Sequence, residues 1–372
     1  IFNDLTLRNG NATGDPFDAG GALLNASGSI TLTAVAVRDS SAALGGGVYS
    51  GGMTTIEGST IAGNSATTSG GGLVASFGAT TIRESFISNN SAGVSAGGIG
   101  ISGDADISST TVRDNTSMGQ AGGIGVQTSA TVTLTDSIIR SNSATTDAGG
   151  IGTEGFLTIS GGEITQNTAG GTGAGIGAQV GNLTVVGTQL TQNIATGDGG
   201  GLALQAGITA EIRFADFGGN QAANGGGIAN TGGNASLFGV TIADGNATAG
   251  AGLALLSGTT TITNSTISGN TASGPGGGIY NASGTLDLRS STISQNAAAT
   301  GGGFEVGNGG TATVRNTIVA GNTATLSDAD VSAGFGGVNS NGFNLIGAGG
   351  TGFTAGANND VVGTPGAPIN AM

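Results

Sequence analysis

The sequence predicts an all-β protein, and the fold it indicates is a right-handed parallel β-helix of about 13 coils. One phrase recurs about every 25 residues: an aliphatic residue, two variable residues, Asn, a small residue, then a Gly-rich triplet closed by another aliphatic. Ile61–Asn64 with Gly70–Leu73 is one copy, and Ile267–Asn270 with Gly276–Ile279 is another. The apolar residues inside each unit alternate with polar ones, which is strand periodicity.

Each unit contains three short runs of this alternation, so we expect three short strands in every coil. Thr131–Thr135 and Thr259–Thr263 are clear examples, and both are rich in β-branched residues. Helices are disfavoured, because each of the 79 glycines would cost about 1 kcal/mol in a helix interior. Right-handed coiling is favoured because parallel crossover connections strongly prefer that hand.

The repeated Asn is expected to form a structural column at a tight turn, where its carboxamide can bond to the backbone and to the coils above and below. Ser40 takes this position in the second unit, and the one long gap coincides with an insertion at residues 15–18. The predicted column comprises Asn11, Asn64, Asn90, Asn115, Asn142, Asn167, Asn193, Asn220, Asn246, Asn270, Asn296 and Asn322.

Stacked coils should bury columns of like residues. One predicted column is Ile56, Ile82, Ile107, Leu134 and Ile159, and a second is Leu73, Ile99, Ile124, Ile151 and Ile176. Because coils contact only their neighbours, one repeat domain can be this long. We expect it to span residues 1–324, with an irregular closing segment at 325–372.

Composition narrows the chemistry. The chain has no Cys, no His and no Lys, which excludes thiol and imidazole catalysis and the usual zinc ligands. Its net charge of −14 disfavours nucleic acid and anionic membranes as partners. No run approaches 18 apolar residues, so no transmembrane helix is expected. Without a recognisable signal peptide, we expect a portion of a longer secreted precursor, with export and anchoring segments elsewhere.

The pairing of aliphatic-x-x-Asn with Gly-Gly-small-aliphatic resembles the repeats of the chlamydial polymorphic outer-membrane proteins. It is still more similar to bacterial secreted β-helix proteins of the CSLREA-type or "choice-of-anchor" group. Phe217–Asn220 and Gly20–Leu23 are the most literal matches, and Asn316–Asn322 with Gly342–Gly347 resembles the segment that closes such arrays. The resemblance implies an adhesin, passenger or surface structural protein, and no catalytic residue carries over.

A polysaccharide lyase or glycosidase is the main rival, since such enzymes need paired carboxylic acids or a calcium-bound carboxylate cluster. The alternative to a catalytic role is a set of solvated acids that keep the chain soluble. The candidate acids are Asp104 with Asp106, Glu154 with Glu163, Asp136 with Asp147, and Asp328 with Asp330.

Calcium and ice are two further possible ligands, and the residues concerned also have an ordinary structural explanation. Calcium has weak candidate ligands in Asp328, Asp330 and Asp360, and ordinary turn chemistry is the favoured explanation of these residues. An outward Thr column that includes Thr55, Thr81 and Thr133 is typical of ice-binding arrays, but β-propensity also explains it.

The sequence therefore predicts a non-enzymatic, extracellular or cell-surface bacterial protein with a structural or adhesive role and no cofactor. Exposed strand edges can template another strand, so self-association into fibres is also expected. The expected partners are further copies of the chain or a surface glycan or protein. The alternative is a carbohydrate-binding or polysaccharide-cleaving β-helix module.

Overall fold

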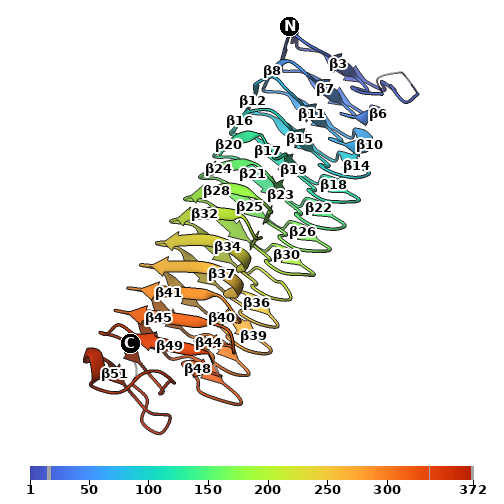
Figure 1. The fold of residues 1–372 in the computed structure, drawn as a ribbon. Helices are drawn as coiled ribbons and strands as arrows, with labels where there is room; N and C mark the ends of the chain where they lie inside the picture. The colour runs from blue at the N-terminus through green and yellow to red at the C-terminus, as the bar shows by residue number, and fades with distance from the viewer. Residues whose placement is uncertain (15–17, 335, 370–372) are drawn as a thin grey trace. The chain divides into compact units, whose positions relative to one another are not determined.

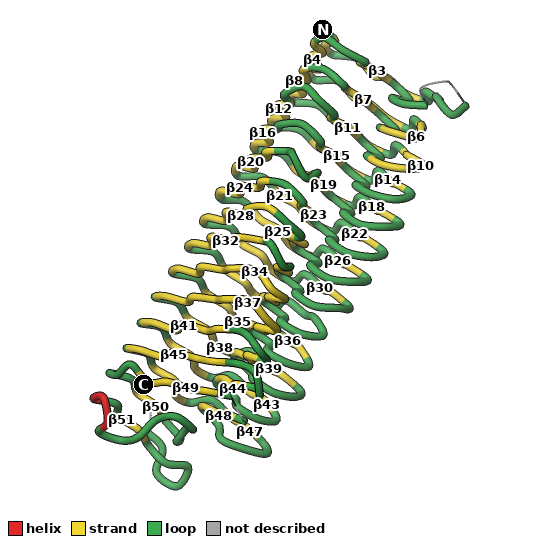
Figure 2. Tube along the Cα trace, viewed as in Figure 1, coloured by secondary structure: helices red, strands yellow, loops and turns green. Residues whose placement is uncertain are grey.

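The computed structural model describes residues 1–14, 18–334 and 336–369. The predicted insertion at residues 15–18 lies, apart from Asp18, outside the described residues. The chain divides into two compact units, Ile1–Thr184 and Val185–Met372. Each unit is a stack of parallel β-coils, as the ribbon in Figure 1 and the strand colouring in Figure 2 show. The prediction of an all-β parallel β-helix is confirmed.

One coil of the first unit illustrates the repeat. It contains β11 (Leu73–Ala75), β12 (Thr80–Arg83), β13 (Phe86–Ser88) and β14 (Ser91–Ala92). Strands equivalent to β11 and β12 form sheet A, those equivalent to β13 form sheet B, and those equivalent to β14 form sheet C. The sequence predicts three strands per coil, and the structure adds the two-residue strand of sheet C directly after the Asn.

The remaining strands of the first unit follow this plan. Sheet A contains β1 (Phe2–Asn3), β3 (Leu23–Asn25), β4 (Ser29–Thr33), β7 (Val48–Ser50), β8 (Met53–Glu57), β15 (Ile99–Ile101), β16 (Ala105–Ser108), β19 (Ile124–Val126), β20 (Thr131–Thr135), β23 (Ile151–Thr153), β24 (Phe156–Ser160) and β27 (Ile176–Ala178). Sheet B contains β2 (Thr6–Arg8), β5 (Ala36–Arg38), β9 (Thr60–Ala62), β17 (Thr111–Arg113), β21 (Ile138–Arg140) and β25 (Glu163–Thr165). Sheet C contains β6 (Ser41–Leu44), β10 (Ser65–Ser69), β18 (Thr116–Ser117), β22 (Ser143–Ala144) and β26 (Thr168–Ala169). Strand β28 (Gly181–Val186) spans the division between the units.

The core of this unit consists of stacked aliphatic side chains, because equivalent residues pair in register. Ile82 pairs with Ile56 in the preceding coil and with Ile107 in the next, and all three side chains are fully or almost fully buried. Leu73 pairs with Ile99 in the same way. Both predicted core columns are confirmed through their remaining pairs.

The Gly triplet marks the place where neighbouring coils approach most closely. A Cβ on Gly71 would lie 2.4 Å from the carbonyl oxygen of Gly97, which is closer than a side chain tolerates. A side chain at this position would therefore separate the two coils, so the repeated glycine is a packing requirement.

The second unit repeats the same plan. Its sheet A contains β31 (Leu202–Leu204), β32 (Ile208–Arg213), β34 (Ile228–Phe238), β37 (Leu253–Thr263), β40 (Ile279–Asn281), β41 (Thr285–Arg289), β44 (Phe304–Val306), β45 (Thr311–Arg315), β48 (Val331–Ala333) and β49 (Gly337–Ser340). Sheet B contains β29 (Gln189–Thr191), β33 (Asp216–Gly218), β35 (Thr241–Ala243), β38 (Thr266–Ser268), β42 (Thr292–Ser294), β46 (Ile318–Ala320), β50 (Leu345–Ile346) and β51 (Val361–Val362). The sheet C positions hold β30 (Ile194–Ala195), β36 (Asn246–Ala247), β39 (Thr271–Ala272), β43 (Ala297–Ala298) and β47 (Thr323–Ala324).

Parallel pairing continues past residue 324. Strand β48 pairs with β44, β49 pairs with β45, and β50 and β51 extend sheet B. Loops and one short 3₁₀ helix, η1 (Ala357–Asn359), separate these last strands. The predicted domain boundary at residue 324 stays a prediction, but the strand ladder itself does not stop there.

Candidate functional site

The repeated Asn residues form a hydrogen-bonded ladder between sheets B and C in each unit. In the first unit, Asn64 donates its backbone N–H and a side-chain N–H to Oδ1 of Asn90, both at 3.0 Å. Its second side-chain N–H donates to the carbonyl of Val37 in the preceding coil at 3.1 Å. Asn90, Asn115 and Asn142 each repeat this arrangement toward the next Asn.

The same ladder runs through the second unit. Asn193 donates to Asn220, Asn270 to Asn296, and Asn296 to Asn322. These side chains and that of Asn167 are buried. Because each carboxamide hydrogen-bonds to backbone or to other ladder residues, we assign these residues to the scaffold rather than to ligand binding.

Two residues of the predicted column, Asn11 and Asn246, do not belong to it. Both are exposed, and the column position is taken by the preceding residue, Gly10 or Gly245. The Gly10 N–H donates to Oγ of Ser40, and the Gly245 N–H donates to Oδ1 of Asn270. The correction has a steric cause. A Cβ on Gly10 would lie 1.9 Å from one backbone oxygen, and a Cβ on Gly245 would lie 2.5 Å from another.

A second buried ladder, which the sequence analysis missed, lies at the turn between sheets A and B. Oγ of Ser85 accepts the backbone N–H of Ser59 at 3.1 Å and donates to the carbonyl of Arg83 at 2.6 Å. Ser59, Thr110 and Ser137 make equivalent bonds in the first unit. Ser265, Ser291 and Thr317 do so in the second. The sequence signal was available as the Ser or Thr that recurs directly before several of the sheet B strands.

Both ladders end in a buried aspartate in the second unit. Oδ1 of Asp330 accepts the backbone and side-chain N–H groups of Asn322 at 3.2 and 2.8 Å, and Oδ2 accepts the Ala348 N–H. In the second ladder, Oδ1 of Asp360 accepts the backbone and side-chain N–H groups of Asn344 at 2.9 and 3.0 Å. A carboxylate accepts hydrogen bonds but has no N–H to donate. It can therefore accept the last N–H groups of a ladder without leaving an unpaired N–H of its own side chain.

The environment of Asp330 changes its acidity. Burial raises the pKa of this carboxyl above its ordinary value, and the hydrogen bonds from Asn322 and from backbone N–H groups oppose the rise. Asp328 is only half-buried. Among the described residues, no three Asp or Glu side chains gather as potential metal ligands. The calcium assignment to Asp328, Asp330 and Asp360 stays a prediction.

The structure brings one of the predicted catalytic acid pairs into a common hollow. Asp104 and Asp106 both lie on the outward face of sheet A at β16, and they line a hollow of ≈ 230 Å³ together with Thr81, Thr131 and Thr133. Oδ1 of Asp104 accepts the Thr131 N–H at 3.2 Å. Neighbouring outward threonines form the expected column, which Asp106 interrupts.

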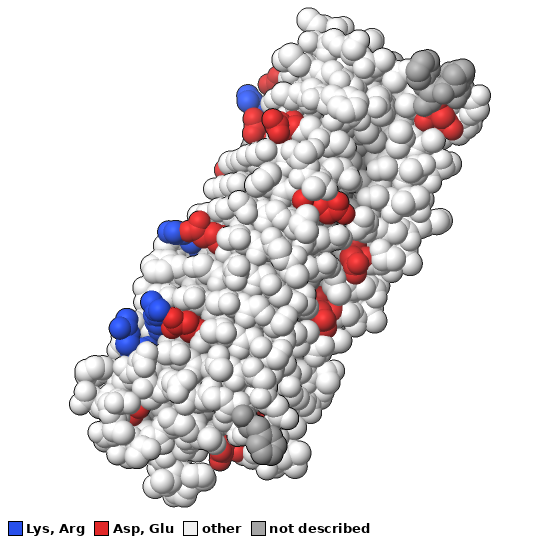
Figure 3. Space-filling view, in the orientation of Figure 1, with Lys and Arg blue, Asp and Glu red and all other residues white. Residues whose placement is uncertain are grey.

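Two of the other acid pairs are split between different parts of a coil. Glu154 follows β23 in sheet A, whereas Glu163 lies in β25 of sheet B. Asp136 lies in the turn after β20, whereas Asp147 precedes the Gly-rich turn that leads to β23. Elsewhere acids pair with arginines on the surface, as in Glu211–Arg213 and Asp287–Arg289. Figure 3 shows such mixed pairs on an otherwise largely uncharged face.

A shallow groove crosses the strands of sheet A in the first unit, and no sequence signal had singled it out. Its floor is the outward residue of successive strands, namely Tyr49, Val74, Gly100, Gly125 and Gly152. Hollows of ≈ 210, ≈ 220 and ≈ 10 Å³ follow one another along it and share lining residues. One wall is formed by Leu44, Ser69, Ser95 and Gln120, and the other by Ser76, Ser102, Gln127, Glu154 and Gln179.

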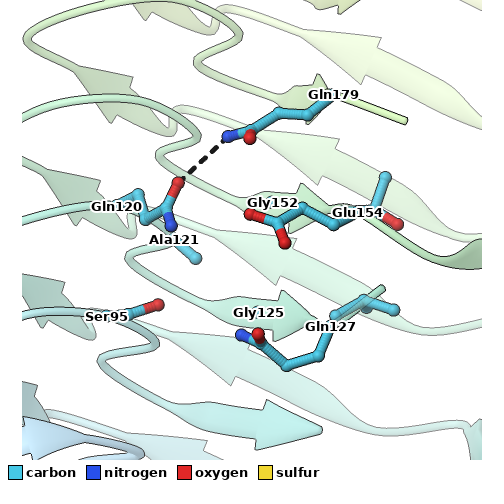
Figure 4. A pocket seen from close by; sticks show the side chains of 10 residues that line it. Ser95, Gln120, Ala121, Gly125, Gln127, Gly152, Glu154 and Gln179 are labelled. Atoms are coloured by element: carbon cyan, nitrogen blue, oxygen red, sulfur yellow. Dashed lines mark hydrogen bonds between the residues drawn. The ribbon is translucent and has the colours of Figure 1, made fainter. Parts of the chain in front are cut away.

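Side chains from the two walls meet across the groove. Nε2 of Gln179 donates to Oε1 of Gln120 at 3.0 Å, and these residues are 59 positions apart in the sequence. Figure 4 shows Glu154 and Gln127 reaching across the floor toward the wall of Gln120 and Ser95. At the other end, Oγ of Ser76 donates to the hydroxyl of Tyr49 at 3.2 Å.

The glycine floor has a local structural cause. The residue four positions before each floor residue has a positive φ, and in three coils it is Ala96, Ala121 or Ala148, with φ of 57°, 56° and 62°. The Cβ atoms of these alanines cover the neighbouring floor, so a Cβ on Gly152 would lie 3.2 Å from both Ala121 and Ala148. Where the positive-φ residue is Gly, as at Gly70, the floor accommodates a larger residue such as Val74.

The comparisons agree with this architecture. A protein-family model described as a right handed beta helix region matches residues 20–197. No curated protein and no solved structure matches the chain. The match and the parallel coils together support a right-handed parallel β-helix fold. Across the described residues, no helix is both long and apolar enough to cross a membrane.

Proposed function

We propose that the chain is a non-enzymatic β-solenoid of the bacterial cell surface or extracellular space, with a structural or adhesive role. The observation that carries this proposal is the use of the repeated polar residues. The buried Asn and Ser/Thr residues of successive coils hydrogen-bond to one another and to the backbone, which makes a scaffold of them. The resemblance of the repeats to CSLREA-type and polymorphic outer-membrane proteins supports the same role.

Self-association is part of this proposal. Strands β1, β2 and β3 each pair with a strand of the following coil through parallel backbone hydrogen bonds, and a coil at the end of such a stack could use the same bonds to pair with another molecule. Sedimentation velocity over a wide concentration range, with electron microscopy of the same samples, tests it. End-to-end assemblies that grow with concentration are expected, and a monomer at every concentration would remove self-association from the proposal.

Location is tested on cells of the source bacterium. An epitope inserted into an exposed turn, for example after Gly58, is expected to be accessible to antibody on intact cells. The structural or adhesive role is tested by deleting the chain and measuring attachment and cell-surface integrity. Labelling only after lysis would contradict a surface role.

A carbohydrate-active module is the second candidate, because Asp104 and Asp106 share a hollow on an exposed face. Paired carboxylates are the minimum that glycoside cleavage requires. Incubation with neutral and acidic polysaccharides, followed by reducing-sugar and unsaturated-product assays, separates the candidates. Turnover that is lost in both Asp104→Asn and Asp106→Asn would replace the non-enzymatic proposal by this one.

A further inference from the structure

The groove on sheet A of the first unit has the form of a binding site for an extended polymer. It crosses successive strands, which are spaced about 4.8 Å apart, so similar groups recur at a regular interval along it. The residues that line the groove change along its length. They are apolar and aromatic at one end (Leu24, Leu44 and Tyr49) and carry carboxamides at the other (Gln120, Gln127 and Gln179).

The groove offers neutral hydrogen-bonding groups and an aromatic ring. Its walls carry carboxamides and hydroxyls, which can both donate and accept. Among the described residues that line its three hollows, none is basic and Glu154 is acidic. With a net charge of −14 on the chain, a polyanionic ligand would be repelled and would find no cation to pair with.

An extended peptide fits less well. Peptides that add to a sheet bind through the free backbone edge of a strand. The floor strands β11, β15, β19 and β23 are each already paired on both sides, so no edge is open to a peptide. A ligand in this groove must therefore bind through side chains and by stacking on the floor.

We infer that the groove binds an extended, uncharged polysaccharide. Sugar hydroxyls match the carboxamides of Gln120 and Gln127, and a sugar ring can stack on Tyr49. Gly125 and Gly152 carry no side chain, so the floor beneath the ligand consists of backbone and the neighbouring alanine methyl groups. This inference deepens the adhesive part of the proposed function and rests on it. It assigns that role a ligand class and requires no catalysis.

The test is calorimetric titration of the whole chain with cellohexaose and chitohexaose as neutral probes and hexagalacturonate as the acidic one. A neutral probe is expected to bind, and hexagalacturonate is not. Tyr49→Ala and Gln127→Ala should each weaken binding by about tenfold, the equivalent of about 1.4 kcal/mol. Gly100→Ala should narrow the floor and weaken binding to a similar degree, because its Cβ would lie in the groove at 3.2 Å from Oγ of Ser69 and 3.5 Å from the Cβ of Ala96.

Controls separate folding from binding. Thr158→Ala changes an outward side chain of β24 away from the groove and should leave the affinity unchanged. Circular dichroism and the melting temperature identify any variant that fails to fold. Tighter binding of hexagalacturonate, binding of an extended peptide in place of the sugars, or no binding of either neutral probe would each overturn the inference. Cell-surface labelling is read separately, so failure of the surface role remains distinguishable from failure of the groove.

Discussion

The methyl group of Ala148 covers the outward face of Gly177, and a Cβ at position 177 would lie 3.1 Å from the Cβ of Ala148. The two residues belong to successive coils, and Ala148 holds a positive φ of 62°. Ala148 adopts a backbone conformation that normally favours glycine. The absence of a side chain at Gly177 leaves room for the methyl group of Ala148.

This pair predicts a double-mutant cycle. Ala148→Gly should stabilise the chain by about 1 kcal/mol, because it relieves a left-handed alanine. Gly177→Ala should destabilise the parent chain by about 1 kcal/mol through overpacking, and should cost little in the Ala148→Gly background. Urea denaturation of the four proteins measures the coupling, and strictly additive changes would contradict it.

The Asn ladder predicts a contrast between two asparagines of the second unit. Asn270→Ala removes the acceptor of the Gly245 N–H and the side-chain donor to Oδ1 of Asn296, and should cost about 2–3 kcal/mol. Asn246→Ala alters an exposed side chain and should change the unfolding free energy by less than about 0.5 kcal/mol. Equal losses in the two variants would restore Asn246 to the column.

The second ladder predicts a similar loss at a hydroxyl. Ser85→Ala leaves the buried Ser59 N–H without its acceptor and should cost about 1–3 kcal/mol. Ser108→Ala, on the outward face of β16, is the matched control and should be close to neutral. Chemical denaturation of both variants checks this, and a neutral Ser85→Ala would mean that another acceptor replaces the hydroxyl.

Asp330 predicts a pH dependence whose sign follows from its raised pKa. The folded chain holds the proton of this carboxyl more strongly than the unfolded chain, whose carboxyl has a pKa of about 3.9. The protonated Asp330 carboxyl therefore contributes its full stabilisation of the folded chain at a pH below the unfolded pKa. This stabilisation is lost as the pH rises through the folded pKa. Relative to Asp330→Asn, the parent chain should gain stability on acidification.

Hydrogen exchange of the Asn322 and Ala348 amides, measured from pH 7 down to pH 4, follows this effect locally. The greater protection of these amides from exchange in the parent chain, relative to Asp330→Asn, should narrow or reverse as the pH rises. Parallel pH profiles for the two proteins would show that Asp330 does not titrate in this range.

The sequence predicted those features that repeat in every coil. The period placed Ile82 and Leu73 in their columns, because a solenoid brings equivalent residues into register. It misplaced Asn11 and Asn246, since alignment on the Asn alone ignored that Gly10 and Gly245 keep the spacing from the preceding aliphatic residue. Steric contact with the Gly-rich segment that follows in the same coil decides those positions, and the Asn repeat alone does not show it.

Features that depend on contacts between coils were not accessible from the repeat. The Gln120–Gln179 bond joins residues two coils apart and defines a groove that no motif indicates. Asp330 looked like a turn residue or a weak metal ligand, and its role as the last acceptor of the ladder depends on a segment that folds back over it. Asp104 and Asp106 line one hollow because Asp104 directly precedes β16 and Asp106 lies two residues later on its outward face, and a catalytic role for this pair stays a prediction.

The aspartates that end the two ladders also make the two ends of the stack of coils different in their hydrogen bonding. A duplicated coil inserted anywhere upstream would find a donor on one side and an acceptor on the other, so it could join without altering its neighbours. A coil added beyond Asp330 would meet a residue that has no N–H to offer from its side chain. Internal duplication of a coil upstream of Asp330 is thus the change in length that the hydrogen bonds of this ladder accommodate best.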